Sequence, residues 1–275
     1  MIRRCRPLLG TFVEIAAPPG CAAAVEAGFA AVSQVHRLMS FHGEDSDLAR
    51  LRHAPAGAPV VLASETMTVL RLALALHRES AGLFDIAVGA RLVRAGFLPL
   101  PAGIELAACT GSSAELELRD DCRAVCHRPM LLDLGGIAKG FAVDRALAAM
   151  RAAGAEGGLI NAGGDMRAFG EHAFDVDIRS ARGHVERRWS LRDQALASSD
   201  NAASRRRRWG RTVTPHIGFG RPLRNRRVVT VVAPDCATAD ALTKVAMADA
   251  PLAARMLRGR GGFLLSPAME QARAA

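Results

Sequence analysis

Lysine is scarce in this sequence. Of the 36 basic residues only two are lysines, Lys139 and Lys244, and the others are arginines. A coding bias toward arginine is the simplest explanation, and it also fits the abundance of alanine and glycine. Under such a bias arginine would be the easy choice at either position. The two lysines are therefore candidates for a specific function.

Long uninterrupted apolar runs are absent as well. No stretch of roughly 18 uncharged apolar residues occurs, which argues against a membrane span. Near the N-terminus Arg3, Arg4 and Arg6 precede a short apolar stretch that Glu14 interrupts, and a secretory signal needs a longer one. We therefore expect a cytoplasmic protein. With 275 residues and a hydrophobic fraction of 50%, the chain can bury a sizeable core, which excludes disorder as its main state.

The cysteines form no C-x-x-C pair. Cys122, Cys126 and His127 come closest to a metal-ligand cluster, but no second half-site accompanies them. A zinc site is therefore not favoured. Free thiols in a reducing compartment are the expectation.

Hydrophobic periodicity predicts both helices and strands. Helices are expected at 21–39, 65–80, 137–153 and 238–249, with a further one starting near Pro251. Strands are expected at 9–15, 158–161 and 228–232, with a hairpin at 115–132 and short strands between 173 and 232. Because the two kinds of element do not alternate strictly, an α+β fold with mixed sheets packed against helices is favoured over a doubly wound sheet. No linker divides the chain, so we expect a single domain of residues 1–275.

A strand, an aspartate, a double glycine and a helix follow one another between 131 and 153. Gly135 and Gly136 let the backbone approach a ligand closely, and the start of the following helix attracts anions. Lys139 adds a positive charge at the same helix end, where a cation opposes the helix dipole unless an anion joins it. The segment predicts a phosphate site, and a tight turn with a solvated lysine is the alternative. It matches neither the G-x-G-x-x-G fingerprint nor a Walker loop.

Asp240, Thr243 and Lys244 are expected to share one face of the predicted helix 238–249, because they are three and four residues apart. A carboxylate and a hydroxyl one turn apart are ligands that suit Mg²⁺. The alternative is an ordinary ion pair between Asp240 and Lys244. The sequence alone favours the ion pair.

Arginines are dense between 205 and 227. Only Trp209 and Phe219 supply aromatic surface there, and no nucleic-acid-binding motif accompanies the stretch. We therefore expect a solvated surface and no nucleic-acid partner. A role in steering an anionic cofactor stays open.

Several short segments follow a known pattern when they are taken in order. They are Leu9-Gly10-Thr11, Ser46-Asp47-Leu48, the run from Gly82 to Gly89, the run from Asp133 to Asp144, the run from Asn161 to Asp165, and Ala239-Asp240-Ala241-Leu242. With these segments the chain resembles the FAD:protein FMN transferase family over nearly its whole length. The run from Asp133 to Asp144 is the most specific of them.

The resemblance implies a flavin-transferase-type fold and a transfer of FMN from FAD to a Thr or Ser hydroxyl of an acceptor protein, with release of AMP and with Mg²⁺ on the pyrophosphate. It implies an FAD site made of Leu9, Phe41, Leu83, Phe84, Asp85, Asp133, Lys139 and Ile217. It further implies a metal site made of the Gly136 carbonyl, Asp240 and Thr243, and it makes His216 the candidate catalytic residue.

The sequence departs from the family pattern after His216-Ile217. Many members continue with x-Asp-Pro-Arg-Thr-Gly, whereas this chain continues with Gly218-Phe219-Gly220 and lacks the acidic residue. If that residue serves near the reacting hydroxyl, its loss weakens or abolishes transfer. Two alternatives therefore stay open: a non-catalytic FAD-binding or flavin-carrier protein, and an FAD pyrophosphatase that yields FMN and AMP.

A second departure concerns the metal. The family usually has a metal-binding Thr four residues after the aspartate equivalent to Asp240, and here that position is Lys244. Thr243 lies about 100° around the helix from it. We therefore expect the Lys244 ammonium to take part of the space and charge of the cation, so that FAD binds with little or no Mg²⁺. The family's usual lipoprotein signal is also absent, which again predicts a cytoplasmic location.

Overall fold

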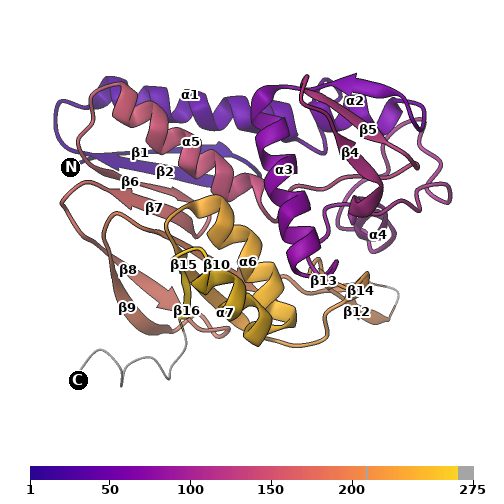
Figure 1. The fold of residues 1–275 in the computed structure, drawn as a ribbon. Coiled ribbons are helices and arrows are strands. Elements are labelled where there is room, and N and C mark those ends of the chain that lie inside the picture. Colours follow the sequence, from indigo (N-terminus) through magenta and orange to yellow (C-terminus); the bar gives the residue numbers. More distant parts are fainter. Residues whose placement is uncertain (209, 266–275) are drawn as a thin grey trace.

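The main sheet is antiparallel, and helices cover one of its faces (Figure 1). In the computed structural model, which describes residues 1–208 and 210–265, its strand order is β1-β2-β6-β7-β10-β15-β16. Its strands are β1 Ile2–Leu8, β2 Thr11–Ala17, β6 Gly158–Ala162, β7 Asp165–Phe169, β10 Ala195–Asp200, β15 Val228–Ala233 and β16 Phe263–Leu265. The covering helices are α1 Ala22–Met39, α5 Ala138–Ala152, α6 Cys236–Ala248 and α7 Ala250–Arg258. The α+β prediction is confirmed.

At β10 both faces of the main sheet carry buried side chains. Because side chains alternate along a strand, Ala195 and Ala197 of β10 join the core beneath the helices, while Leu196 packs on the opposite face. There it meets Phe174 of β8 (Phe174–Arg179) and Leu191 of β9 (Val185–Leu191), two strands that form a separate ribbon.

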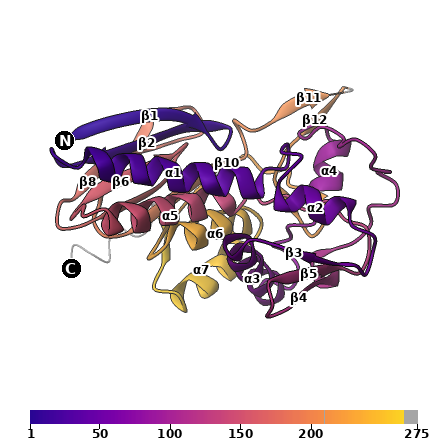
Figure 2. The ribbon, with the colours of Figure 1, turned by 90° about the horizontal axis from the view of Figure 1, so that it is seen from above.

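A smaller part of the molecule lies beside the main sheet (Figures 1 and 2). It contains a sheet with the order β3-β5-β4, three α-helices and one 3₁₀ helix. These elements are α2 Asp47–His53, β3 Pro59–Val61, α3 Ser64–Glu79, α4 Gly89–Arg94, the 3₁₀ helix η1 Ser113–Glu115, β4 Leu116–Leu118 and β5 Arg123–Cys126. Gly89 at the start of α4 donates to the Leu131 carbonyl at 2.9 Å, which ties this part to the segment that leads into α5.

The arginine-rich stretch forms two small hairpins. They are β11 Arg206–Arg208 with β12 Arg211–Val213, and β13 Ile217–Gly218 with β14 Arg221–Pro222. The β11–β12 hairpin lies on the side of α4 in both views (Figures 1 and 2), and the Arg206 guanidinium stands 5.1 Å from the centre of the Phe97 ring. Trp209, an aromatic residue of this stretch, lies outside the described residues.

The predicted helices at 21–39, 65–80, 137–153 and 238–249 are confirmed to within two residues at each end. The predicted strand 9–15 is wrong in its start. Residues 2–8 form a strand of their own, and Leu9 and Gly10, with φ angles of 57° and 71°, make the two-residue turn to β2. β1 was not predicted because it is an exposed edge strand. Arginines point to both of its faces, so the sequence shows no alternation of apolar and polar residues.

Two further differences concern short elements. The sequence predicts no helix between residues 39 and 65, but α2 lies there, and the Ser46 hydroxyl caps its first turn by accepting from the Ala49 amide at 3.1 Å. The return strand of the predicted hairpin ends at Cys126, and residues 130–132 belong to no strand. None of the helices among the described residues combines the length and apolar character needed to cross a membrane.

Candidate active site

A cavity of about 670 Å³ lies between the main sheet and the smaller part of the molecule. Its volume falls within the range of small-molecule sites. The structure brings many of the predicted residues together in its wall. These are Leu83, Phe84, Asp85, Asp133, Gly136, Lys139, His216 and Ile217.

Four other predicted residues do not line the cavity. Asp240 and Thr243 are fully buried directly behind Lys139 and Lys244. Leu9 lies in the turn between β1 and β2. Phe41 is buried in a small hydrophobic cluster with Ala90, Cys109 and Leu131, so the structure gives it a packing role.

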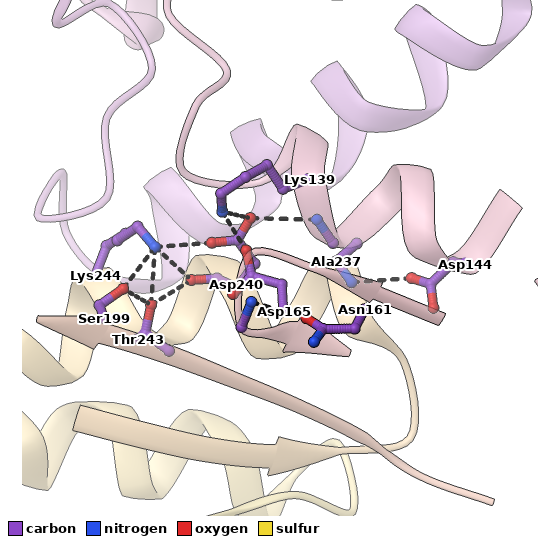
Figure 3. Close-up of polar contacts among 11 residues, drawn as sticks. Lys139, Asp144, Asn161, Asp165, Ser199, Ala237, Asp240, Thr243 and Lys244 are labelled. Carbon is purple, nitrogen blue, oxygen red and sulfur yellow. Dashed lines mark hydrogen bonds and ion pairs between the residues drawn. The ribbon is translucent and has the colours of Figure 1, made fainter. Parts of the chain in front are cut away.

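The crossing of α5 over α6 positions Lys139. A Cβ atom at Gly140 would stand only 2.1 Å from the Cys236 carbonyl oxygen, so glycine is needed for the two helices to approach this closely. The Gly140 amide donates to Asp240 Oδ2 at 3.3 Å. One turn further along α5, the Asp144 carboxylate also holds the two helices together. It accepts from the Cys236 and Ala237 amides at 2.9 Å and so caps α6 (Figure 3).

The turn between β6 and β7 positions Asp165. Gly163 and Gly164 have φ angles of 64° and 99°, a backbone that favours glycine, and Asn161 Oδ1 accepts from the Gly164 amide at 2.9 Å. Asp165 is the first residue of β7 and is 2% exposed. Its carboxylate accepts from Lys139 Nζ (Figure 3). Asp165 closes the run from Asn161 to Asp165 in the family pattern, a segment for which the sequence predicts no role.

Two lysines and two aspartates thus form one charged cluster. Lys139 Nζ also lies 3.3 Å from Asp240 Oδ2, and Lys244 Nζ lies 2.7 Å from Asp240 Oδ1. The carboxylates are buried, whereas the lysine side chains are 27% and 22% exposed and line the cavity. The cluster therefore presents both ammonium groups to the cavity, and Asp165 lines the cavity beside them. The ion pair predicted between Asp240 and Lys244 is confirmed, and the solvated lysine considered for position 139 is wrong.

The pKa values in the cluster follow from burial and charge. Burial alone would lower the pKa of Lys139, but the carboxylates of Asp240 and Asp165 outweigh it and raise that pKa. Burial alone would raise the pKa of Asp240, but Lys139 and Lys244 hold it below its ordinary value. Lys139 is therefore in its charged form where the cavity meets it. Burial also raises the pKa of Asp133 on the cavity wall.

Oxygen atoms surround the Lys244 ammonium. It donates to Asp240 Oδ1 at 2.7 Å, to Ser199 Oγ at 2.8 Å and to Thr243 Oγ1 at 3.0 Å, and the Asp240 carbonyl oxygen lies at 3.3 Å (Figure 3). Ser199 comes from β10, 45 residues before Lys244. No signal in the sequence pointed to it.

His216 stands on the cavity wall with an unpaired nitrogen. Its Nε2 is buried and has no hydrogen-bond partner within the described part of the chain, while the ring forms a hydrogen bond with the backbone of Asp200. Burial and the neighbouring Lys244 charge lower the pKa of His216 to about 4. The imidazole is therefore neutral at pH 7 and able to accept a proton.

The donor set expected for Mg²⁺ does not fit a divalent ion. Mg²⁺ requires oxygen ligands at about 2.0–2.1 Å in near-octahedral geometry. Here the carboxylate of Asp240 and the hydroxyl of Thr243 already bond to Lys244 Nζ. The lysine chain also lies close to Gly136, since a Cβ atom there would stand 3.3 Å from Lys244 Cγ. An ammonium and a divalent ion cannot share these atoms.

A family model described as the ApbE family matches residues 9–261. The chain belongs to the ApbE family. A curated relative from Vibrio cholerae named FAD:protein FMN transferase is 28% identical over 232 residues, which are 77% of this chain and 69% of the relative. A relative of the same name from Treponema pallidum is 30% identical over 173 residues, and the match spans about half of it, 48%.

Solved ApbE structures share the fold. The ApbE protein from Thermotoga maritima is 26% identical, with a TM-score of 0.84 over 96% of this chain and 93% of that one. The flavinyl transferase ApbE from Pseudomonas stutzeri is 22% identical with a TM-score of 0.80 over 96% of this chain and 90% of that one, a likeness of fold. The ApbE fold therefore extends over nearly the whole chain.

Proposed function

We propose that this ApbE-family chain is an FAD:protein FMN transferase, which moves FMN from FAD to a Thr or Ser hydroxyl of an acceptor protein and releases AMP. The observation that carries the proposal is the cavity where two lysine ammonium groups stand beside the N-terminus of α5. A diphosphate is the group in FAD that such a site suits, because ammonium groups and a helix N-terminus both attract it. The names of the curated relatives support the same reaction.

In this proposal the pyrophosphate of FAD lies against Gly135, Gly136, Lys139 and Lys244. The cavity wall near it is apolar at Leu83, Phe84 and Ile217, and we assign these residues to the ring systems. Asp85 supports this wall, because its Oδ1 accepts from the Ser113 hydroxyl at 2.5 Å and from the Ala87 amide at 2.8 Å.

The transfer is a displacement at phosphorus. The hydroxyl oxygen of the acceptor bonds to the phosphorus of the FMN half, the bond from that phosphorus to the bridging oxygen breaks, and the oxygen leaves with AMP. Lys139 and Lys244 balance the charge that develops on the phosphate oxygens. We assign His216 Nε2 as the acceptor of the hydroxyl proton, because this nitrogen is unpaired and neutral at pH 7. Because the expected Mg²⁺ donors hold Lys244, no step of the proposed reaction runs through a metal.

One observation favours the flavin-carrier alternative. The hairpin that follows His216 turns at Phe219 and Gly220, which both have positive φ, and Phe219 is 64% exposed. Neither residue carries a carboxylate, so this turn supplies none near the proposed reaction centre. A carrier would bind FAD in the same cavity and release nothing.

Incubation of the purified protein with FAD and a Thr-bearing acceptor peptide, with and without Mg²⁺, tests the proposal. Chromatography measures AMP, and mass spectrometry measures an FMN adduct on the peptide. AMP together with an adduct is the expected result. AMP without an adduct would instead assign FAD hydrolysis, and tight FAD binding with neither product would assign the carrier.

We further propose a cytoplasmic location and acceptor. All six cysteines are free thiols, as a reducing compartment favours. Alkylation of the protein in intact cells before lysis tests this, because oxidised cysteines would resist labelling.

A further inference from the structure

The surroundings of the Lys244 ammonium have the composition of a site for a hard cation. They comprise one carboxylate oxygen, two hydroxyl oxygens and one backbone carbonyl oxygen, all within 3.3 Å of Nζ, and Asp240 alone supplies two of the four. Oxygen-only donor sets of this kind are typical of Mg²⁺, Ca²⁺ and Mn²⁺. In this chain the cation among them is part of a side chain.

The hydroxyl groups are held in place by each other. Thr243 Oγ1 donates to the Asp240 carbonyl oxygen at 2.6 Å, and Ser199 Oγ lies 2.7 Å from Thr243 Oγ1. Ser199, Asp240 and Thr243 are each at most 5% exposed. The oxygen atoms are therefore a fixed arrangement contributed by β10 and α6, and they do not depend on solvent.

Charge balance explains why the arrangement requires a cation. Asp165 and Asp240 are two buried carboxylates, and Lys139 and Lys244 are the ammonium groups that pair with them. Without Lys244 one buried negative charge would be unbalanced, which is costly in a desolvated site. A cation bound in its place would restore the balance.

We propose that Lys244 is a tethered substitute for a divalent cation, so that FAD binds this site without added metal. The identity of FAD as the ligand rests on the proposed function. Because the ammonium is covalently attached, it is present at every metal concentration. It also presents its charge to the diphosphate from the same side of the cavity as Lys139.

Titration of FAD into the wild-type protein in EDTA, and again in saturating Mg²⁺, is the first test. The two dissociation constants should agree within threefold, because Lys244 already occupies the donors. A tightening of threefold or more in Mg²⁺ would overturn the proposal. A protein that binds no FAD under either condition would contradict the proposed function instead.

The second test needs no flavin. Removal of the lysine should create the metal site, so the Lys244→Thr variant should bind Mn²⁺ at one equivalent in electron paramagnetic resonance titrations at least tenfold more tightly than the wild type. Lys244→Met is the matched control, because it removes the same charge but fills the space with an apolar chain, and it should gain no Mn²⁺ site. Equal Mn²⁺ binding by the wild type and Lys244→Thr would overturn the proposal. Should Lys244→Thr fail to fold, the wild-type FAD titration still decides.

Discussion

At the scale of single residues, the charged cluster shows why the scarcity of lysine is informative. Lys139 and Lys244 each bond to two or more side chains within a space that α5, α6 and β10 enclose. An ammonium is compact and carries its three donors on one atom, whereas a guanidinium is a wide planar fork. We therefore expect an ammonium to match the carboxylate and hydroxyl oxygens at these two positions better than a guanidinium would.

The buried imidazole of His216 makes the stability of the protein depend on pH. Its pKa falls from 6.5 to about 4 on folding, because burial and the charges of Lys244 and Lys139 outweigh the Asp200 contacts that raise it. Between pH 6.5 and 4 the unfolded chain therefore binds a proton that the folded chain does not, and stability falls as the pH falls through this window. The loss attributable to His216 reaches at most about 3 kcal/mol near pH 4.

Urea unfolding at pH 7 and at pH 4 measures this, with His216→Gln as the matched variant. Gln keeps a polar side chain but does not titrate, so other groups cancel in the difference between the two proteins. The wild type should lose more stability than His216→Gln on acidification. Equal losses would show that His216 binds its proton equally well in both states.

At the scale of elements, the crossing of α5 over α6 determines the site. Gly140 permits the approach, Asp144 caps α6, and the Asp240 carboxylate receives the Gly140 amide. The site is therefore as rigid as the contact between these helices. The positions of Lys139 on α5 and Asp240 on α6 depend on this contact.

Gly140→Ala should open the crossing. Its Cβ atom would meet backbone atoms, the Cys236 carbonyl oxygen at 2.1 Å and the Ala237 amide nitrogen at 2.8 Å, and neither can rotate away. We expect a loss of about 1–3 kcal/mol in unfolding free energy, together with at least tenfold weaker FAD binding. Gly259→Ala is the control, because the φ of Gly259 is −66° and the nearest neighbour of a Cβ there, the Met256 carbonyl oxygen, is 3.8 Å away. Equal unfolding curves for both variants would contradict this account.

The sequence predicts the elements better than it predicts the site. Amphipathic periodicity located α1, α3, α5 and α6, because each buries one face or more. It could not show that Asp165 reaches Lys139 across 26 residues, or that Asp240 reaches it across 101. Such pairings depend on how the elements pack. Local sequence patterns and the family resemblance both pointed to Lys139 and Asp240, but Ser199 and the packing role of Phe41 came only from the structure. The single-domain boundary 1–275 stays a prediction.

At the scale of the whole molecule, the chain carries a net positive charge, and part of it lies at the cavity. The formal net charge is +9, and Arg206 of the β11–β12 hairpin stands on the cavity wall. A positive surface around a cavity raises the association rate of an anionic ligand, and salt screens the effect. We therefore expect the surface arginines to raise the rate at which FAD associates with the protein.

Stopped-flow fluorescence at low and high salt measures this rate. The association rate constant of FAD should fall severalfold between about 20 mM and 300 mM salt, where the screening length shortens to a few ångströms. Riboflavin has the same ring system without phosphate and serves as the neutral control, with a rate that should stay constant. A salt effect of equal size for both ligands would argue against steering.

The long sequence separation within the charged cluster also determines when the cavity can form during synthesis of the protein. Lys139 and Asp240 are 101 residues apart, and Lys244 comes four residues later still. A nascent chain that has emerged only through β10 holds Lys139, Asp165 and Ser199 but none of the groups that α6 supplies. Contacts of such high order form late in folding. The cavity is therefore complete only when α6 has left the ribosome, so we expect the proposed flavin site to form after β10, β15 and α6 have all been synthesised.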